Sequence, residues 1–196
     1  MNSLVLASAS PRRQELLQQI GVSYVTLIVD VDETPVKGEL AETYVLRLAR
    51  EKSIQAWHFQ NGDLPVLGAD TCVVIDGQIL GKPKDKGHAI KMLKSLSGRC
   101  HQVITAVALK QGDRLSTVVS VSEVCFAELT DDVCHAYLAT GESMDKAGAY
   151  AVQGMAAAFI DNITGSYSGV MGLPLFETVQ LLKQFKVPFW SVKNNQ

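Results

Sequence analysis

Residues 64–75 read LPVLGADTCVVI, which places a carboxylate inside the most strand-like stretch of the chain. Val66 and Leu67 precede Asp70, and an apolar, β-branched run extends from it to Ile75, so we predict strand structure interrupted at residues 68–71. An ionised carboxylate in a central strand is costly unless it is paired, hydrogen-bonded or bound to a metal. Asp70 is therefore either held by hydrogen bonds in a turn or part of a charged site.

Helical and strand patterns alternate along the rest of the chain. Periodicity, capping residues and turn signals predict strands at 4–7, 22–29, 78–80, 102–109, 115–128 and 157–160, and helices at 11–20, 40–57, 85–96, 131–140 and from Pro174 onward. This intermixing predicts an α/β or α+β fold with a mixed twisted sheet and flanking helices. If two lobes surround a central cleft, the chain crosses between them near residues 81–86 and 140–154.

Composition places the chain among globular proteins. It has 196 residues, 47% of them hydrophobic, and 18 Lys and Arg against 20 Asp and Glu give a formal charge of −2. That apolar content excludes a disordered chain and is sufficient for one packed domain or two small lobes. The absence of a basic excess argues against a stable nucleic-acid partner, whose affinity depends on neutralising phosphates.

The sequence also indicates the cellular compartment of the protein. No apolar run approaches the roughly 20 residues that span a bilayer, and no signal peptide is visible at the N-terminus, so we expect no membrane association. The cysteines show no C-x-x-C pair and no zinc-ligand spacing; they are Cys72, Cys100, Cys125 and Cys134. We therefore expect reduced, buried thiols in a cytoplasmic protein.

Two arginines, Arg12 and Arg13, stand at the start of the first predicted helix, where Ser10 is a good N-cap and Pro11 fits the first turn. The positive end of a helix disfavours arginine unless an anion is nearby. Free backbone N–H groups and the hydroxyls of Ser8 and Ser10 complete an environment suited to phosphate. The alternative is an exposed basic turn.

Two lysines also stand out. Lys52 follows Tyr44 and Leu48 at helical spacing, so it lies on the face that should be buried. It either extends along the core edge to reach water or turns its ammonium inward to meet phosphate oxygens. Lys82 lies between Gly81 and Pro83, which either leave it in a solvated loop or hold it at a fixed point in a cleft.

Glu33 is a second candidate acid, flanked by Asp30 and Asp32 in a segment that reads as a solvated loop when taken alone. Magnesium prefers few protein oxygens, with water and substrate phosphates completing its octahedron. Glu33 and Asp70 together with a phosphate would supply such a set. From the residues alone, these features leave the function open.

Taken in order, the same segments resemble a known family. The matching motifs, from residue 3 to about residue 185, are LASASPRR (6–13), VDE (31–33), LAREK (48–52), GADT (68–71), GKP (81–83), KAGAY (146–150), QG (153–154) and GLP (172–174). They are similar to the Maf family of nucleotide pyrophosphatases, which is also associated with septum formation and cell-division arrest.

The resemblance implies a single Maf-like domain over residues 1–196, with a two-lobed fold like that of the inosine triphosphate pyrophosphatases. It implies hydrolysis of a nucleoside triphosphate to the monophosphate and pyrophosphate with a divalent cation, Mg or Mn. Asp70 would be the catalytic residue, as general base or as a metal ligand with Glu33. The phosphates would contact a set of hydroxyls and cations, namely Ser8, Ser10, Arg13, Lys52 and Lys82.

The resemblance also implies a substrate branch. The members that act on dTTP and UTP carry Arg, Thr and Gln at three positions, and this chain has Arg12, Thr71 and Gln153 there. The branch that acts on 7-methyl-GTP has Trp, Gln and Glu instead. A non-catalytic, nucleotide-binding regulator of septum formation is the alternative function, and a homodimer is compatible with either.

Overall fold

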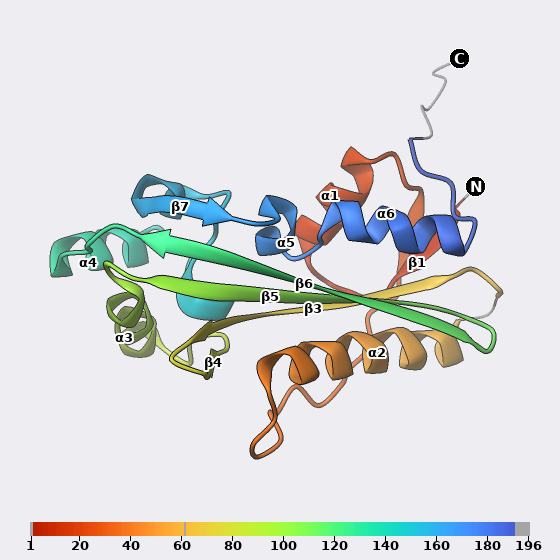
Figure 1. The fold of residues 1–196 in the computed structure, drawn as a ribbon, viewed down its shortest axis with the longest axis horizontal. Helices are drawn as coiled ribbons and strands as arrows, with labels where there is room; N and C mark the ends of the chain where they lie inside the picture. The colour runs from red at the N-terminus through yellow and green to blue at the C-terminus, as the bar shows by residue number, and fades with distance from the viewer. Residues whose placement is uncertain (1, 61, 191–196) are drawn as a thin grey trace.

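The computed structural model describes residues 2–60 and 62–190, which form a mixed α/β fold (Figure 1). Its elements are β1 (Leu4–Leu6), α1 (Pro11–Gln19), β2 (Tyr24–Thr26), α2 (Ala41–Phe59), β3 (Val66–Ile75), β4 (Gln78–Leu80), α3 (Lys86–Leu96), β5 (Cys100–Gln111), β6 (Arg114–Phe126), α4 (Asp131–Ala139), the 3-10 helices η1 (Ala147–Ala149) and η2 (Met155–Phe159), β7 (Ile160–Thr164), α5 (Tyr167–Met171) and α6 (Leu175–Gln184). The expected fold class is confirmed.

One sheet organises these elements. Within the described residues it has seven strands in the order β2-β1-β3-β5-β6-β7, and β4 pairs with the far end of β3. β1 is parallel to β2 and β3, whereas the remaining pairs are antiparallel. β1 is short and ends at Leu6 beside Leu67, so β3 extends well beyond it. The edge of β3 from Gly68 to Cys72, between the parts that pair with β1 and β4, is therefore open to the loops that follow β1 and β2.

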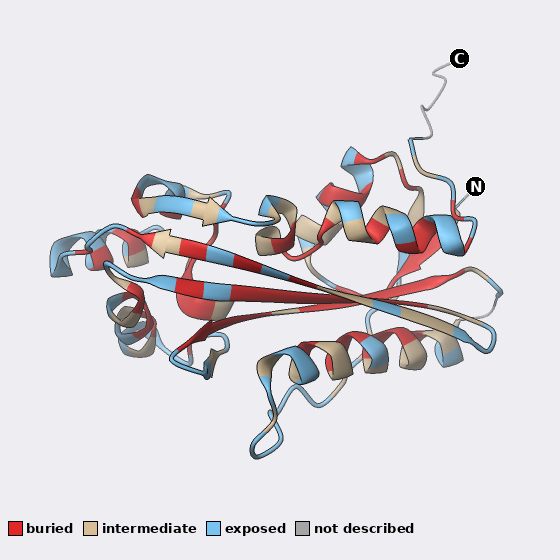
Figure 2. Cartoon of the chain, in the orientation of Figure 1, coloured by how far each residue is buried: buried red, intermediate tan, exposed pale blue. Residues whose placement is uncertain are grey.

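The two faces of the sheet are covered differently. Side chains alternate along a strand, and the even-numbered residues of β3 and β5, such as Cys72 and Ile104, pack against α2. The odd-numbered residues pack at one end against α1 and α6, as Leu67 does, and at the other end against α3, as Val73 does. Helices thus gather at both ends of the long strands, whose centre is buried (Figures 1 and 2).

Several predicted elements need correction. β3 runs without a break through residues 68–71, because all of these residues pair with β5. The strand expected at 22–29 is limited to β2, since its partner β1 has only three residues. Residues 157–160 are not a strand but mostly the end of η2, as the helix preference of consecutive alanines favours. The short helix α5 was not predicted.

The cysteine expectation is half right. Cys72 and Cys134 are buried free thiols, as expected, but Cys100 and Cys125 form a disulfide. They are 25 residues apart in sequence, and the β5–β6 register makes them direct cross-strand neighbours. The expectation of four reduced thiols is therefore wrong, because spacing along the chain carries no information on this register.

The described part of the chain contains no helix that is both long and apolar enough to cross a membrane.

The two segments expected to cross between lobes meet each other, since the N–H of Gly148 donates to the carbonyl of Gly81 over 3.2 Å.

Gly68 allows α2 to approach β3 closely. A Cβ atom at this position would lie 2.4 Å from the carbonyl oxygen of Ala49 and 2.7 Å from the backbone nitrogen of Ser53. Real Cβ atoms do not come so close to backbone atoms, so a side chain here would push the helix away from the strand. The contact brings the middle of α2 directly over the strand that carries Asp70.

We therefore predict that Gly68→Ala destabilises the fold. Overpacking a tight contact typically costs about 1–3 kcal/mol of unfolding free energy, and here the neighbouring atoms are backbone that cannot rotate away. Urea denaturation measures the loss. Gly62→Ala is the matched control, because a Cβ there meets nothing within 4 Å. Equal stability of the two variants would contradict the close contact.

Candidate active site

The candidate residues converge where the parallel strands β1 and β2 end beside the middle of β3. Ser8 follows β1, Arg13 lies in the first turn of α1, and Glu33 belongs to the loop between β2 and α2. Asp70 is in β3 and Lys52 is in α2. The carboxyl ends of adjacent parallel strands meet at one edge of a sheet, and ligands of open α/β sheets commonly bind in the crevice there.

An ion-pair cluster of Lys52, Asp70 and Glu33 forms the centre of the site. The Lys52 ammonium donates to Asp70 Oδ1 at 2.6 Å and to Glu33 Oε1 at 2.7 Å. Lys52 and Asp70 are each about nine-tenths buried. Lys82, which is exposed, approaches the other oxygen of Glu33 at 3.8 Å. The ammonium thus turns inward, and the alternative in which Lys52 extends to water is wrong.

The cluster also indicates where a cation fits. Asp70 and Glu33 each direct one carboxylate oxygen at the Lys52 Nζ atom, so negative charge faces this position from two sides. Partial burial acts to raise the pKa of Glu33, but the hydrogen bond from Lys52 and the charges of Lys52, Lys82 and Arg13 outweigh it and lower that pKa. Glu33 is therefore kept ionised, as a metal ligand or an ion-pair partner must be.

Side chains of α2 fix the loop that carries Glu33. The hydroxyl of Tyr44 donates to the backbone carbonyl of Glu33 at 2.9 Å. The guanidinium of Arg47 donates to the carbonyls of Asp32 and Thr34 and forms a two-pronged ion pair with Glu39 at 2.8 and 2.9 Å. Arg47 was not predicted as a site residue, because only the folded loop brings these carbonyls onto the helix.

Arg13 is held on the other side of β3. Its Nε donates to the carbonyl of Gly172 at 2.8 Å, and its terminal nitrogens donate to the hydroxyls of Ser8 and Thr71 at 3.1 Å each. Three of its five N–H groups are thus engaged, which leaves two for a ligand. Ser10 occupies the N-cap position of α1, but its side chain makes no capping hydrogen bond.

A series of hydrogen-bonded hydroxyl groups holds Thr71, one of the partners of Arg13, in place. Thr105, opposite Thr71 in the β3–β5 register and fully buried, donates to the carbonyl of Gly169 at 2.8 Å. Its single proton is thereby used, so in the 2.9 Å contact between the two threonines Thr71 is the donor. Thr71 in turn accepts from Arg13. Thr105 was not expected, because the register that pairs it with Thr71 is not readable from local sequence.

Arg12 faces a different segment. Burial lowers the pKa of Arg12, and the nearby carboxylates of Asp145, Glu15 and Glu142 oppose that shift. Glu142 accepts the backbone N–H of Met155 with both oxygens at 3.0 Å, close to the exposed Gln153. Arg12 and the loop that carries Gln153 therefore border the same acidic residue.

Fold and site together define an α/β protein in which a buried carboxylate, a half-exposed one and clustered cations suit a polyanionic ligand with a cation. Residues 3–185 match the family described as Maf-like protein, and the chain belongs to this family.

Several named proteins are similar to this chain in sequence or in structure. A dTTP/UTP pyrophosphatase of Aromatoleum aromaticum is 53% identical over 94% of this chain and 96% of its own length. A dTTP/UTP pyrophosphatase of Escherichia coli O157:H7 is 49% identical over 94% of both chains. The solved structure of a HAM1 protein from Coxiella burnetii covers 94% of this chain and 100% of its own, with a TM-score of 0.55 and 20% identity. That likeness agrees with the fold that the family resemblance implies.

The ion-pair cluster predicts a large stability loss in Lys52→Met. Removing one partner of a buried pair leaves an uncompensated charge and typically costs about 3–5 kcal/mol. The double variant Lys52→Met/Asp70→Asn should recover much of this loss, because the stranded charge is gone. Urea denaturation at neutral pH with a metal chelator measures both.

Lys94→Met is the matched control for this cycle. Lys94 pairs with Asp131 at 2.6 Å on the surface, where such pairs contribute about 0–1 kcal/mol. A loss in Lys52→Met no larger than in Lys94→Met would contradict a buried cluster that depends on its ammonium.

Proposed function

We propose that this protein is a nucleoside triphosphate pyrophosphatase that hydrolyses dTTP and UTP to the nucleoside monophosphate and pyrophosphate. The observation that carries the proposal is the ion-pair cluster in which the buried Asp70 and Lys52 meet the half-exposed Glu33 beyond the carboxyl ends of the parallel strands. A binding protein has no evident need for a costly buried acid. The names of the relatives at about 50% identity support the choice of substrate.

Asp70 and Glu33 would hold a divalent cation, Mg or Mn. The fit rests on the geometry of the two carboxylates, which already share one positive charge, and on the preference of these cations for oxygen ligands. Such a cation, when bound, polarises phosphate oxygens and lowers the pKa of a coordinated water.

The protein's own groups would then clamp the triphosphate. Ser8, Ser10, Arg13, Lys52 and Lys82 would donate to phosphate oxygens and stabilise the charge that develops on pyrophosphate as it leaves. Asp70 would accept the proton of the attacking water, or orient that water as a ligand of the cation. Hydrolysis forms one bond from the water oxygen to phosphorus and breaks the anhydride bond to pyrophosphate.

Of the three residues of the branch pattern, Arg12 and Gln153 would contact the base, and Thr71 would act indirectly. Arg12 and Gln153 both lie near Glu142, which supports a shared role, and they would offer polar groups to a pyrimidine edge. The hydroxyl of Thr71 is already bonded to Arg13 and Thr105, so its influence would pass through the position of Arg13. A pocket of polar groups rejects a base that leaves them unpaired.

Three further expectations stay predictions. They are a single domain over residues 1–196 with the site in a cleft between two lobes, a cytoplasmic location without a nucleic-acid or membrane partner, and a homodimer. Sedimentation equilibrium of the purified chain measures the last of these directly.

Asp70→Asn should nearly abolish turnover. The amide keeps the shape of the side chain but cannot accept the proton, and loss of a general base costs roughly 10²–10⁴-fold. Pyrophosphate release from a panel of nucleotides with Mg or Mn measures it, with Asp76→Asn as a surface control. If the variant keeps more than about a tenth of the activity, or if wild type shows no turnover, the regulator becomes the better function.

Base selection is tested by changing Arg12 and Gln153 in one variant and Thr71 in another. The double variant Arg12→Trp/Gln153→Glu should lower kcat/KM for UTP and dTTP more than for 7-methyl-GTP, by roughly 5- to 150-fold, because unpaired pocket groups cost about 1–3 kcal/mol. Thr71→Val should instead lower kcat/KM for all nucleotides alike, whereas Thr71→Ser keeps the hydroxyl and the activity. Equal losses on all three nucleotides in the double variant would remove the residue-level basis for base selection.

A further inference from the structure

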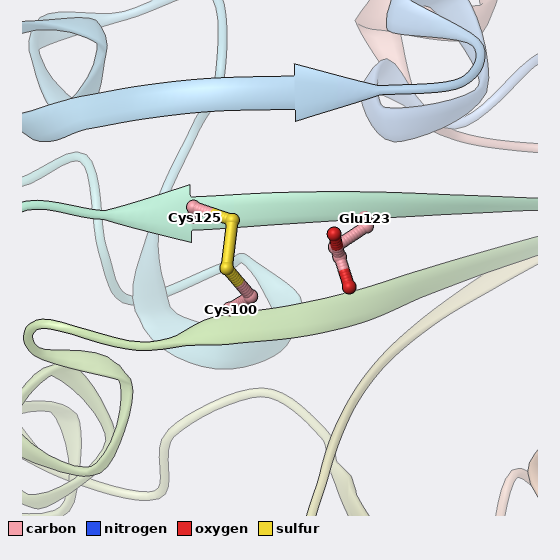
Figure 3. Close-up of side chains that lie close together, drawn as sticks. All are labelled: Cys100, Glu123 and Cys125. Atoms are coloured by element: carbon pink, nitrogen blue, oxygen red, sulfur yellow. A yellow bond between two sulfur atoms is a disulfide. The ribbon is translucent and has the colours of Figure 1, made fainter.

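A second cluster of ligand-type side chains lies at the opposite end of the long strands. Cys100 on β5 and Glu123 and Cys125 on β6 place two sulfurs and a carboxylate oxygen within 4.8 Å of one another (Figure 3). The two cysteines are joined as a disulfide, and the Glu123 side chain lies beside it. Cys100 and Glu123 are exposed and Cys125 is half-buried, so all three are open to solutes.

The strand register accounts for this grouping. Glu123 and Cys125 are two residues apart on β6 and therefore project from the same face of the sheet. Cys100 lies directly opposite Cys125 on the neighbouring strand. This is the face that α2 covers elsewhere. Next in sequence, His101 projects from the other face, where its ring packs on Phe126 and is hydrogen-bonded to Tyr150 at 2.8 Å, so it is no part of the cluster.

The donor set matches a borderline-soft divalent cation. Thiolates and a carboxylate are typical ligands of Zn²⁺, with metal–sulfur distances of about 2.3 Å and metal–oxygen distances of about 2.0–2.2 Å. Tetrahedral coordination separates two sulfurs by about 3.8 Å, so the disulfide must open before both can bind one ion. A cavity of about 240 Å³, lined by Cys100, Glu123, Gln102 and Asp76 among others, leaves room for water as a fourth ligand.

We propose that the reduced form of this protein binds one Zn²⁺ ion through Cys100, Cys125 and Glu123, and that the disulfide is the metal-free form of the same site. Two thiol groups of a reductant supply two electrons, which break the Cys100–Cys125 bond and leave two protein thiols and a reductant disulfide. Zinc binding then releases both thiol protons. In the reverse direction a disulfide oxidant accepts two electrons from the two thiolates and, with two protons, becomes two thiols, while the Cys100–Cys125 bond forms and the ion is released.

This site is separate from the proposed active site. Cys100 precedes Thr105 by five residues on β5, about 17 Å along the strand. The two sites also differ in ligand class, because the active site offers oxygens and this one offers mainly sulfur. The inference therefore does not depend on the pyrophosphatase activity, and its test does not measure activity.

The experiment titrates the full-length chain with Zn²⁺ by calorimetry and with Cd²⁺ by the sulfur-to-metal charge-transfer absorption. Reduced protein is prepared with a phosphine that is removed before titration, and oxidised protein is the reference. We expect the reduced chain to bind one ion more than the oxidised chain does, and only the reduced chain to show the charge-transfer band. Bound Zn²⁺ should also slow the alkylation of Cys100 and Cys125 by a maleimide.

Variants assign the ligands. Cys100→Ser should abolish the charge-transfer band, and Glu123→Gln should weaken Zn²⁺ binding at least about tenfold, since even outer-shell changes cost 10- to 100-fold. Cys134→Ala, which removes a buried free thiol, and Asp76→Asn, which removes another carboxylate at the cavity, should bind as wild type does. Circular dichroism checks that each variant is folded.

Three outcomes would overturn the proposal. They are equal numbers of ions bound by the reduced and oxidised chains, a charge-transfer band that survives Cys100→Ser, and equal affinity of reduced wild type and reduced Glu123→Gln.

Discussion

The buried ammonium of Lys52 is the charge on which the site depends. It joins a helix, a strand and a loop, because Asp70 and Glu33 can be held close together only when a positive charge lies between them. The close approach of α2 to β3 at Gly68 makes this contact possible. Packing and electrostatics are thus coupled. Helix α2 packs against the sheet and also supplies the Lys52 ammonium, which offsets the cost of burying the Asp70 carboxylate.

The site uses both faces of one strand. Asp70 and Thr71 are consecutive in β3, so their side chains project to opposite faces, one toward Lys52 and the other toward Arg13. Because β1 ends early, the edge of β3 is open at this point and the loops after β1 and β2 can close around it. Because β1 has only three residues, acidic and basic side chains from the segments after β1 and β2 can both reach the middle of β3.

The long strands of the sheet also separate two clusters of ligand-type side chains. Near their centre the donors are carboxylate oxygens paired with cations, and at their far end they are sulfurs beside a single carboxylate. Hard and soft cations differ in ligand preference, so the two donor sets favour different ions. The rigidity of the antiparallel β3–β5–β6 register keeps them apart.

The sequence by itself determined most of the elements, the anomaly of Asp70 and the unusual arginines at the start of α1. These follow from local patterns, since periodicity, capping and turn residues act over a few positions. Only the tertiary structure decided that Lys52 faces Asp70 and Glu33, that Thr105 supports Thr71, that Arg47 fixes the Glu33 loop and that Cys100 meets Cys125. The same holds for the short β2, whose length is set by its partner β1. Each of these depends on strand register or on helix-to-strand contact between residues far apart in the chain, and such pairings are selected by the packing of the whole sheet.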